Sequence, residues 1–315
     1  MLRLSIAVLA ASLALASAAN ARPIGLGTNP QGSIAYAAAS AIGKVVEEKT
    51  DLQARVIPQG GPEILIPLTL QGEFDVTFAN TVAANFAYQG LDSFPQAMTG
   101  LRAVIAVFPL RLGLYVRQDS GIDTAADLKG RRIAWGYTQQ RNLQAFTEAY
   151  LAAAGLGEAD IDPVPVPSGA RGVADFKEGK VDAVLFSLTA GLAKEADAAV
   201  GGMKILPFPQ DAKGEAAIAA KSPGAVVEVL QPAPAFAGVR TPTAVLETPL
   251  VMLASANADD AMVRKLAETV LDNHAELAAA VAAFRGFDPQ NPAPRFGVPY
   301  HPAAEALFKE RGLWK

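Results

Sequence analysis

A loop of small polar residues near the start of the chain could bind an anion. A short apolar run ends at Thr28, and residues 29–33 then lead into a segment with the pattern of a helix. The first backbone N–H groups of a helix lack partners within it, so they attract a carboxylate or a phosphate. Ser33 is equally suited to a second role, as the cap of the helix. We expect ligand contacts from Thr28, Asn29, Gln31, Gly32 and Ser33.

Three further polar loops each follow a predicted strand, after residues 57, 79 and 135. Ligands of open α/β sheets bind beyond the carboxyl ends of the strands, so all four loops are expected to share one cleft. After residue 79, Thr81 is expected to cap a helix and Asn80 to contact the ligand. The candidate contacts in these three loops are Gln59, Gly60, Asn80, Thr81, Tyr137, Thr138 and Arg141.

Arg141 is the best candidate for a direct contact with a carboxylate. It stands at the predicted start of a long helix, and a guanidinium can bind a carboxylate through two parallel hydrogen bonds. The alternative is an arginine on a solvated first turn, although a cation there opposes the helix dipole. Together with the helix N-termini, this arginine favours a small organic anion as the ligand.

Catalysis and metal binding have few candidate residues. The chain has no Cys and two His, His274 and His301. This composition excludes disulfides, thiolate metal sites and a thiol nucleophile, and it leaves little from which to build a multi-histidine site or a Ser-His-Asp triad. Neither His lies in a predicted cleft loop. We expect no catalytic residues, no metal and no cofactor, and an exported hydrolase is kept only as an alternative.

Residues 1–21 have the pattern of an export signal. Arg3 precedes an apolar run from Leu4 to Ala16, and Ala-Asn-Ala at 19–21 offers a small-x-small cleavage site before Arg22. The run of about 13 residues is shorter than the ~20 that a membrane-spanning helix needs. We expect a cleaved signal peptide and a periplasmic location; an uncleaved anchor is the alternative.

The charge of the mature chain argues against nucleic acid as a partner. Removing Arg3 from 27 basic residues leaves 26 against 31 acidic ones, a net charge of −5. Proteins that bind nucleic acid through phosphate contacts concentrate positive charge instead.

The elements that carry these loops alternate between strands and helices, which predicts an α/β fold with parallel sheets and helices on both faces. We expect strands at 24–27, 52–57, 74–79, 101–108, 112–117, 132–135, 164–166, 182–186, 226–230 and 248–255. We expect helices at 33–49, 64–71, 81–88, 138–154, 171–178, 259–284 and 303–311.

The pattern occurs twice along the chain. A strand, a polar loop and a long helix span 24–49 and again 132–154, and a short helix, a glycine, an acid and a strand span 68–78 and again 176–186. Two similar α/β lobes would explain the repetition, and chance similarity of two α/β units is the alternative.

The segments in order resemble a known family, the periplasmic solute receptors of TRAP transport systems, in their TAXI branch. The resemblance covers nearly the whole mature chain. Similar segments are G-L-G-T-N-P-Q-G-S-I-A-Y at 25–36, G-E-F-D-V at 72–76, D-S-G-I at 119–122 with D-L-K-G-R-R-I at 127–133, G-K-V-D-A at 179–183 and Y-H-P-A-A at 300–304. The loops at 28–32 and 136–141 depart from the family pattern, so the ligand of a relative should not be assumed here.

The resemblance implies a two-lobed, type II-like periplasmic-binding-protein fold with the ligand in the cleft between the lobes. It implies a signal peptide at 1–21, lobe I at 22–110 plus 231–315, and lobe II at 111–230. Arg141 matches an arginine of the family's second loop, and Arg111, near the lobe crossing, would line the cleft or pair with an acid across the hinge.

The function it implies is that of a monomeric receptor, not an enzyme. The receptor would capture a dicarboxylate, a 2-oxoacid or a glutamate-like solute and deliver it to a TRAP membrane permease. The alternative is the binding component of another uptake or sensory system.

Overall fold

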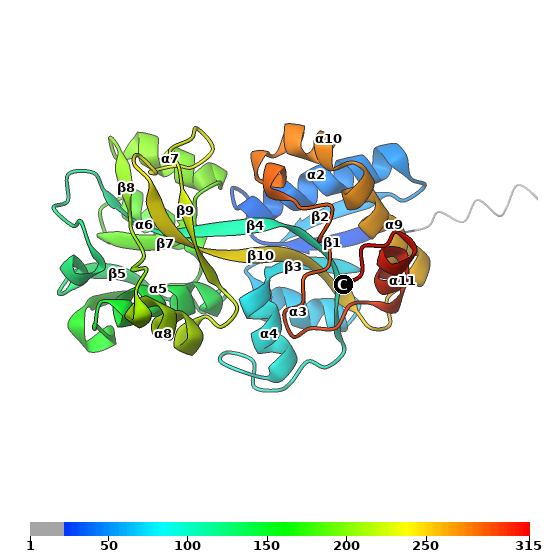
Figure 1. The fold of residues 1–315 in the computed structure, drawn as a ribbon, viewed down its shortest axis with the longest axis horizontal. Coiled ribbons are helices and arrows are strands. Elements are labelled where there is room, and N and C mark those ends of the chain that lie inside the picture. Colours follow the sequence, from blue (N-terminus) through cyan, green and yellow to red (C-terminus); the bar gives the residue numbers. More distant parts are fainter. Residues whose placement is uncertain (1–21) are drawn as a thin grey trace, which may run out of the picture.

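The chain folds into two α/β lobes joined by two long strands (Figure 1). The structure is a computed structural model that describes residues 22–315, so the predicted signal peptide at 1–21 lies outside the described residues. The strand order in the sheet is β2-β1-β3-β10-β4-β7-β5-β6, with β8 added beside β4 and β9 beside β10.

Lobe I carries the first parallel strands and both ends of the described chain. Strand β1 pairs in parallel with β2 on one side and β3 on the other. Its strands are β1 (Ile24–Thr28), β2 (Ala54–Pro58) and β3 (Val76–Asn80). Its helices are α2 (Ile34–Lys49), α3 (Pro62–Leu70), α4 (Thr81–Gln89), α9 (Asp260–Asp272), α10 (His274–Ala280), the 3-10 turn Ala282–Gly286 and α11 (Pro302–Glu310).

Lobe II repeats the arrangement, with β5 parallel to β6 and β7. Its strands are β5 (Arg132–Gly136), β6 (Asp162–Val166), β7 (Ala183–Ser187), β8 (Met203–Leu206) and β9 (Val226–Leu230). Its helices are α5 (Arg141–Ala153), α6 (Gly169–Lys177), α7 (Gly191–Ala199) and α8 (Ala212–Lys221), with 3-10 turns at Ala125–Leu128 and Glu158–Asp160. Helix α7, strand β8 and helix α8 are not among the elements expected from the sequence.

Two antiparallel strands, β4 (Leu101–Arg117) and β10 (Thr243–Ser255), run from one lobe into the other (Figure 1). The sequence predicted two strands where β4 is one. The residues on both sides of Pro109, which lies between the two expected strands, are buried and paired with β10. Beyond the expected lobe boundary at 231, residues 243–247 pair with β9, and Arg240 forms an ion pair with Asp197 of α7.

The sequence repeat has a structural counterpart in two equivalent aspartates. Asp75 Oδ2 accepts a hydrogen bond from the Gly25 backbone N–H at 2.7 Å, and Asp182 Oδ2 accepts one from the Arg132 backbone N–H at 2.9 Å. An arginine side chain pairs with each carboxylate, Arg22 in lobe I and Arg132 in lobe II. The donor and acceptor residues are 50 positions apart in both lobes. Each lobe therefore ties its first strand to its third in the same way.

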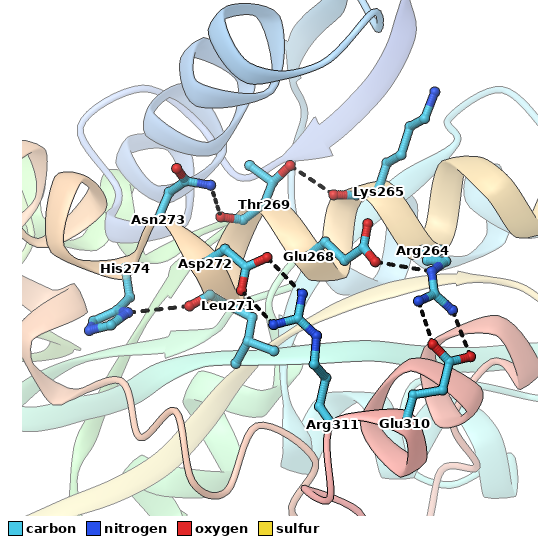
Figure 2. Close-up of polar contacts among 10 residues, drawn as sticks. All are labelled: Arg264, Lys265, Glu268, Thr269, Leu271, Asp272, Asn273, His274, Glu310 and Arg311. Atoms are coloured by element: carbon cyan, nitrogen blue, oxygen red, sulfur yellow. Dashed lines mark hydrogen bonds and ion pairs between the residues drawn. The ribbon is translucent and has the colours of Figure 1, made fainter.

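Ion pairs join the C-terminal helix α11 and the residue after it to α9 of lobe I (Figure 2). Both guanidinium nitrogens of Arg264 on α9 donate to Glu310 of α11, at 3.0 and 2.6 Å. Arg311 just beyond α11 donates to Asp272, at 3.2 and 3.0 Å. The helix expected at 259–284 is broken, because Asn273 has non-helical backbone angles (φ −117°, ψ 24°). No helix in the described part of the chain is long and apolar enough to cross a membrane.

Candidate functional site: a cavity between the lobes

A cavity of about 40 Å³ lies where the two lobes meet. Elements of both lobes and both crossing strands contribute to its wall. The lining residues are Asn29, Ser33, Ile34, Ala35, Pro62, Phe78, Ala79, Asn80, Leu110, Leu112, Gln140, Asn142, Leu143, Phe186, Ser187 and Leu250. Most of them lie at or beyond the carboxyl ends of strands β1, β3, β5 and β7, which is where ligands of open α/β sheets bind.

The lobe I wall begins at the N-terminus of α2. Ser33 caps this helix, with Oγ accepting a hydrogen bond from the Tyr36 backbone N–H at 3.2 Å. The loop reaches the cap through Gly32, whose φ of +82° is a backbone conformation that favours glycine. Asn29 also lines the cavity, and its side-chain oxygen is buried without a hydrogen-bond partner. Of the five ligand contacts expected from the first loop, Asn29 and Ser33 line the cavity.

Asn80, and not Thr81 as expected, caps α4. Asn80 is the cap of α4, with Oδ1 accepting a hydrogen bond from the Ala83 N–H at 2.9 Å, and it also lines the cavity. Thr81 does not cap the helix. It is the first helical residue, and its hydroxyl shares a 2.7 Å hydrogen bond with that of Thr248 on β10. The cap falls one residue earlier because Asn80 already has the extended backbone of a cap position.

The lobe II wall is built from the start of α5 and the end of β7. Gln140 Oε1 accepts a hydrogen bond from the Gly169 N–H at 2.7 Å, which fixes its side chain against α6. Asn142 is 4% exposed, and its Oδ1 is buried without a partner. Neither residue was among the predicted contacts, although both flank Arg141. Ser187 was also missed, although it ends a buried strand at its carboxyl end.

Arg141 does not line the cavity. Its guanidinium donates to the Gly136 carbonyl at 3.1 Å, to Gln144 Oε1 at 2.6 Å and to Asp92 Oδ1 at 3.4 Å. Its backbone N–H donates to Glu63 Oε1 at 2.9 Å. Burial raises the pKa of Glu63 to about 7, although the Arg141 N–H and the Ser93 hydroxyl favour its charged form. The start of α5 thus already holds an acidic group from the other lobe.

Arg111 forms an ion pair across the two crossing strands. Its Nε lies 3.0 Å from Glu247 Oε2, and the two residues face each other in the strand register. Burial raises the pKa of Glu247, and the charge of Arg111 opposes this shift. Of the two roles that the sequence left open for Arg111, the structure shows the pair with an acid at the hinge.

The other predicted residues lie around the cavity without lining it. Thr28 and Tyr137 are fully buried, and Gln31, Gln59 and Thr138 are exposed. Gly32 and Gly60 lie where the lobes touch. Ligand binding by the predicted residues stays a prediction.

The structure shows the lobes closed over the cavity. The Leu192 N–H of α7 donates to the Gly32 carbonyl of lobe I at 3.3 Å. A Cβ added at Gly61 would lie 1.9 Å from the Gln139 carbonyl oxygen of lobe II. Contacts this close hold only while the lobes are together. No cluster of three or more potential metal ligands is present among residues 22–315.

Comparison with known proteins supports the architecture. The model of the NMT1-like family matches residues 26–312. PhnD1 of Prochlorococcus marinus, solved with methylphosphonate, superposes with a TM-score of 0.60 at 10% identity, over 93% of this chain and 99% of that one. The alkanesulfonate-binding protein SsuA of Xanthomonas axonopodis pv. citri, bound to MOPS, gives 0.53 at 18% identity, over 91% and 83%.

A third solved structure comes from Streptococcus pneumoniae. It is an amino acid ABC transporter substrate-binding protein bound to L-arginine, with a TM-score of 0.52 at 11% identity, over 84% of this chain and 95% of that one. These likenesses confirm the two-lobed periplasmic-binding-protein fold that the sequence predicted.

Proposed function

The chain belongs to the NMT1-like family, and from this membership and the inter-lobe cavity we propose that it is a solute-binding receptor of a membrane uptake system. The observation that carries the proposal is the closed cavity, which takes its wall from both lobes and from the crossing strands. A solute held there would contact both lobes at once and so favour the closed form over the open one.

The crossing strands give the lobes a means to open. Only β4 and β10 run between them, so a change of backbone angles near the middle of these two strands would separate the walls of the cavity. Closure removes the solute from water and presents a surface composed of both lobes. A permease could recognise that surface and accept the receptor only when it is loaded.

The class of permease has two candidates. The motif resemblance to TAXI receptors favours a TRAP permease, while the fold likeness to an amino acid ABC transporter protein favours an ATP-driven one. Reconstituted uptake would separate them, because only the second kind needs ATP inside the vesicle. Genes beside this one that encode a fused large-and-small permease would favour the first.

An exported hydrolase is less well supported. Ser33 and Ser187 line the cavity, but neither His does: His274 begins α10, and His301 caps α11 with its Nδ1 toward the Ala303 N–H at 3.4 Å. A serine nucleophile would need a base within about 3 Å. We propose a binding protein that works in the periplasm after removal of residues 1–21, which cell fractionation and N-terminal sequencing of the mature protein would check.

The receptor function is tested by solute release and by shape. Native mass spectrometry of the purified mature protein should show bound solute that denaturation releases. Small-angle X-ray scattering should then show a smaller radius of gyration with solute than after its removal. A protein that carries no solute and keeps one shape across a broad panel of metabolites would contradict the proposal.

A further inference from the structure

The cavity wall is uncharged. Among residues 22–315, those that line the cavity include no Asp, Glu, Lys, Arg or His. Asn29, Ser33, Asn80, Gln140, Asn142 and Ser187 supply its polar groups, and the remaining residues are apolar. A carboxylate, sulfonate or phosphonate enclosed here would lose its water without gaining a cation in exchange, which is unfavourable for a buried charge.

Neither arginine on which the expectation of an anion rested is available to the cavity. The guanidinium of Arg141 already has three acceptors, which are Gly136 O, Gln144 and Asp92. Arg111 is paired with Glu247 at the crossing strands. Release of either arginine toward the cavity would leave a partly buried carboxylate without its cation.

Each of the three helix N-termini around the cavity has one backbone N–H group that already has a partner. Ser33 accepts from the third N–H of α2, and Asn80 accepts from the third N–H of α4. At α5, the first N–H donates to the carboxyl group of Glu63. An acidic group that is already at the start of α5 would repel a second one nearby. One donor at each of the three helix N-termini is therefore occupied before a solute enters.

The wall instead has amide groups without partners. The Oδ1 atoms of Asn29 and Asn142 are buried without a hydrogen bond, one in each lobe, and the side chain of Asn142 is 4% exposed. A buried acceptor without a donor is unfavourable, and both residues line the cavity, so a donor on the solute is the partner that these amides lack. Whichever way an amide is turned, it offers one acceptor and two donors. A solute with its own N–H or O–H groups would satisfy both lobes at once.

The rest of the wall favours a solute with an apolar part. Phe78, Leu110 and Leu250 come from lobe I and the crossing strands, and Leu143 and Phe186 come from lobe II. All five side chains are nearly or fully buried. The cavity volume of about 40 Å³ limits the solute to a small molecule, since a single water needs roughly 10–15 Å³ by the same measure.

We propose that the solute, given the receptor function above, is a small uncharged molecule that carries N–H or O–H donors on an apolar frame. Carboxamides, lactams and hydroxylated or amino-substituted small rings belong to this class. Asn29 and Asn142 would hold its polar end from opposite lobes, and the apolar residues would enclose its frame. Binding of such a solute would couple the two lobes without an ion pair.

The first test identifies the charge of the bound solute. The full mature protein is purified from the periplasm of the producing cells without a step that removes bound solute. It is then denatured, and the released solute is identified by mass spectrometry. A solute that is neutral at pH 7 supports the proposal. A carboxylate, sulfonate or phosphonate overturns the ligand class while leaving the receptor function intact.

The second test uses matched probes on ligand-stripped protein. Calorimetry compares propanamide with propanoate, butanamide with butanoate and lactamide with lactate. Within a pair, the amide should bind at least tenfold more tightly than the carboxylate. The reverse order overturns the proposal. Failure of every probe, together with an absence of any released solute, would contradict the receptor function itself.

Substitutions of Asn142 test whether its side chain contacts the solute, while a separate measurement checks that the protein still folds. Asn142→Asp keeps the shape of the side chain but replaces the amide NH₂ with a second oxygen. The preference for amide over carboxylate should rise at least tenfold further, because an added negative charge repels only the carboxylate. Asn142→Ala should weaken both probes, and thermal melting checks that both variants fold. An unchanged preference in Asn142→Asp would remove Asn142 from the site, and the proposal with it.

Discussion

Pro109 of β4 lies opposite Pro249 of β10 in the register of the two crossing strands. Proline has no backbone N–H group, so neither residue can donate a hydrogen bond to the other strand at this point. The register shifts just beyond, between Leu250 and Val251. The paired prolines therefore mark a place where the connection between the lobes is weakly hydrogen-bonded and able to bend.

Replacement of both prolines by alanine should stiffen this connection. The P109A/P249A variant gains two N–H donors, each able to contribute about 0.5–1.5 kcal/mol. The unfolded chain becomes more flexible at the same time, which costs about 0.4–1 kcal/mol per residue. The free energy of unfolding should therefore change by less than about 2 kcal/mol, while the solute-dependent change in radius of gyration becomes smaller. An undiminished change in scattering would argue against a hinge at these residues.

Gly61→Ala should block closure. The added Cβ would lie 1.9 Å from the Gln139 carbonyl oxygen of the other lobe, yet the extended backbone of Gly61 (φ −167°) suits alanine. Solute affinity should fall at least tenfold with no loss of thermal stability, as calorimetry and melting would show. Gly157→Ala is the matched control, because a Cβ there meets nothing within 4 Å and its φ is −138°. Equal affinities in the two variants would mean that Gly61 does not meet Gln139 in the bound form.

Glu63 should make closure depend on pH. The carboxyl group is buried between α3, Asp92–Ser93 and the Arg141 N–H, and its pKa is raised to about 7 in the closed form. In an open form that separates it from Arg141, we expect its pKa to return toward its usual 4.5. The closed form therefore binds the proton of Glu63 more tightly than the open form does. Closure is favoured most below about pH 4.5, where both forms are protonated, and it weakens as the pH rises to about 7.

The measurement is solute affinity from pH 4.5 to 8. We expect a decrease of about tenfold or more in the native protein, since each unit of pKa difference corresponds to a factor of ten. Glu63→Gln should bind with an affinity that changes little over this range. A native protein whose affinity rises with pH would contradict the direction of the effect.

Asp75 and Asp182 should contribute similarly to the stability of their lobes. Each carboxylate joins a backbone N–H and an arginine side chain. Replacement of either aspartate by Asn keeps the shape of the side chain but removes its charge. Hydrogen bonds to a charged group contribute about 1.5–3 kcal/mol to the free energy of unfolding, and less where solvent screens them. Urea unfolding of D75N and D182N should show comparable losses. A loss confined to one lobe would mean that the repeat is one of sequence only.

Acid should reproduce part of this loss at Asp182. Burial alone would raise its pKa, but the side chain and backbone N–H of Arg132 outweigh burial and lower the pKa overall. A lowered pKa adds stability above the usual pKa of an aspartate, and that stability disappears as the pH falls through the shifted value. The difference in unfolding free energy between D182N and the native protein should therefore shrink at low pH.

Helix starts could be predicted from the sequence where the stabilising contact joins residues that are only a few positions apart. Ser33 and Asp259 cap their helices through backbone N–H groups three residues further on, which is a short-range pattern. The two-lobed fold follows from the repeated α/β pattern. The break in the helix at Asn273 was not predicted, because the residues around it are good helix formers and no Pro or Gly marks the point where the backbone leaves the helix.

The cavity was harder to predict because its partners are distant in sequence. Arg141 was placed in the correct loop, but its acceptor Asp92 is 49 positions away, in a segment without a recognisable motif. Asn142, one residue further along, faces the cavity instead. On a helix, adjacent residues point about 100° apart, so the choice between them depends on how the helix is rotated against the other lobe. That rotation is set by tertiary packing.

An uncharged cavity wall also affects how the protein would perform in different surroundings. Attraction between a charged solute and exposed charges at a binding site weakens as dissolved salt screens it, over about 10 Å at 0.1 M. Amide groups and apolar side chains are little affected by that screening. The proposed receptor would therefore capture its solute with nearly the same affinity in dilute water and in brine.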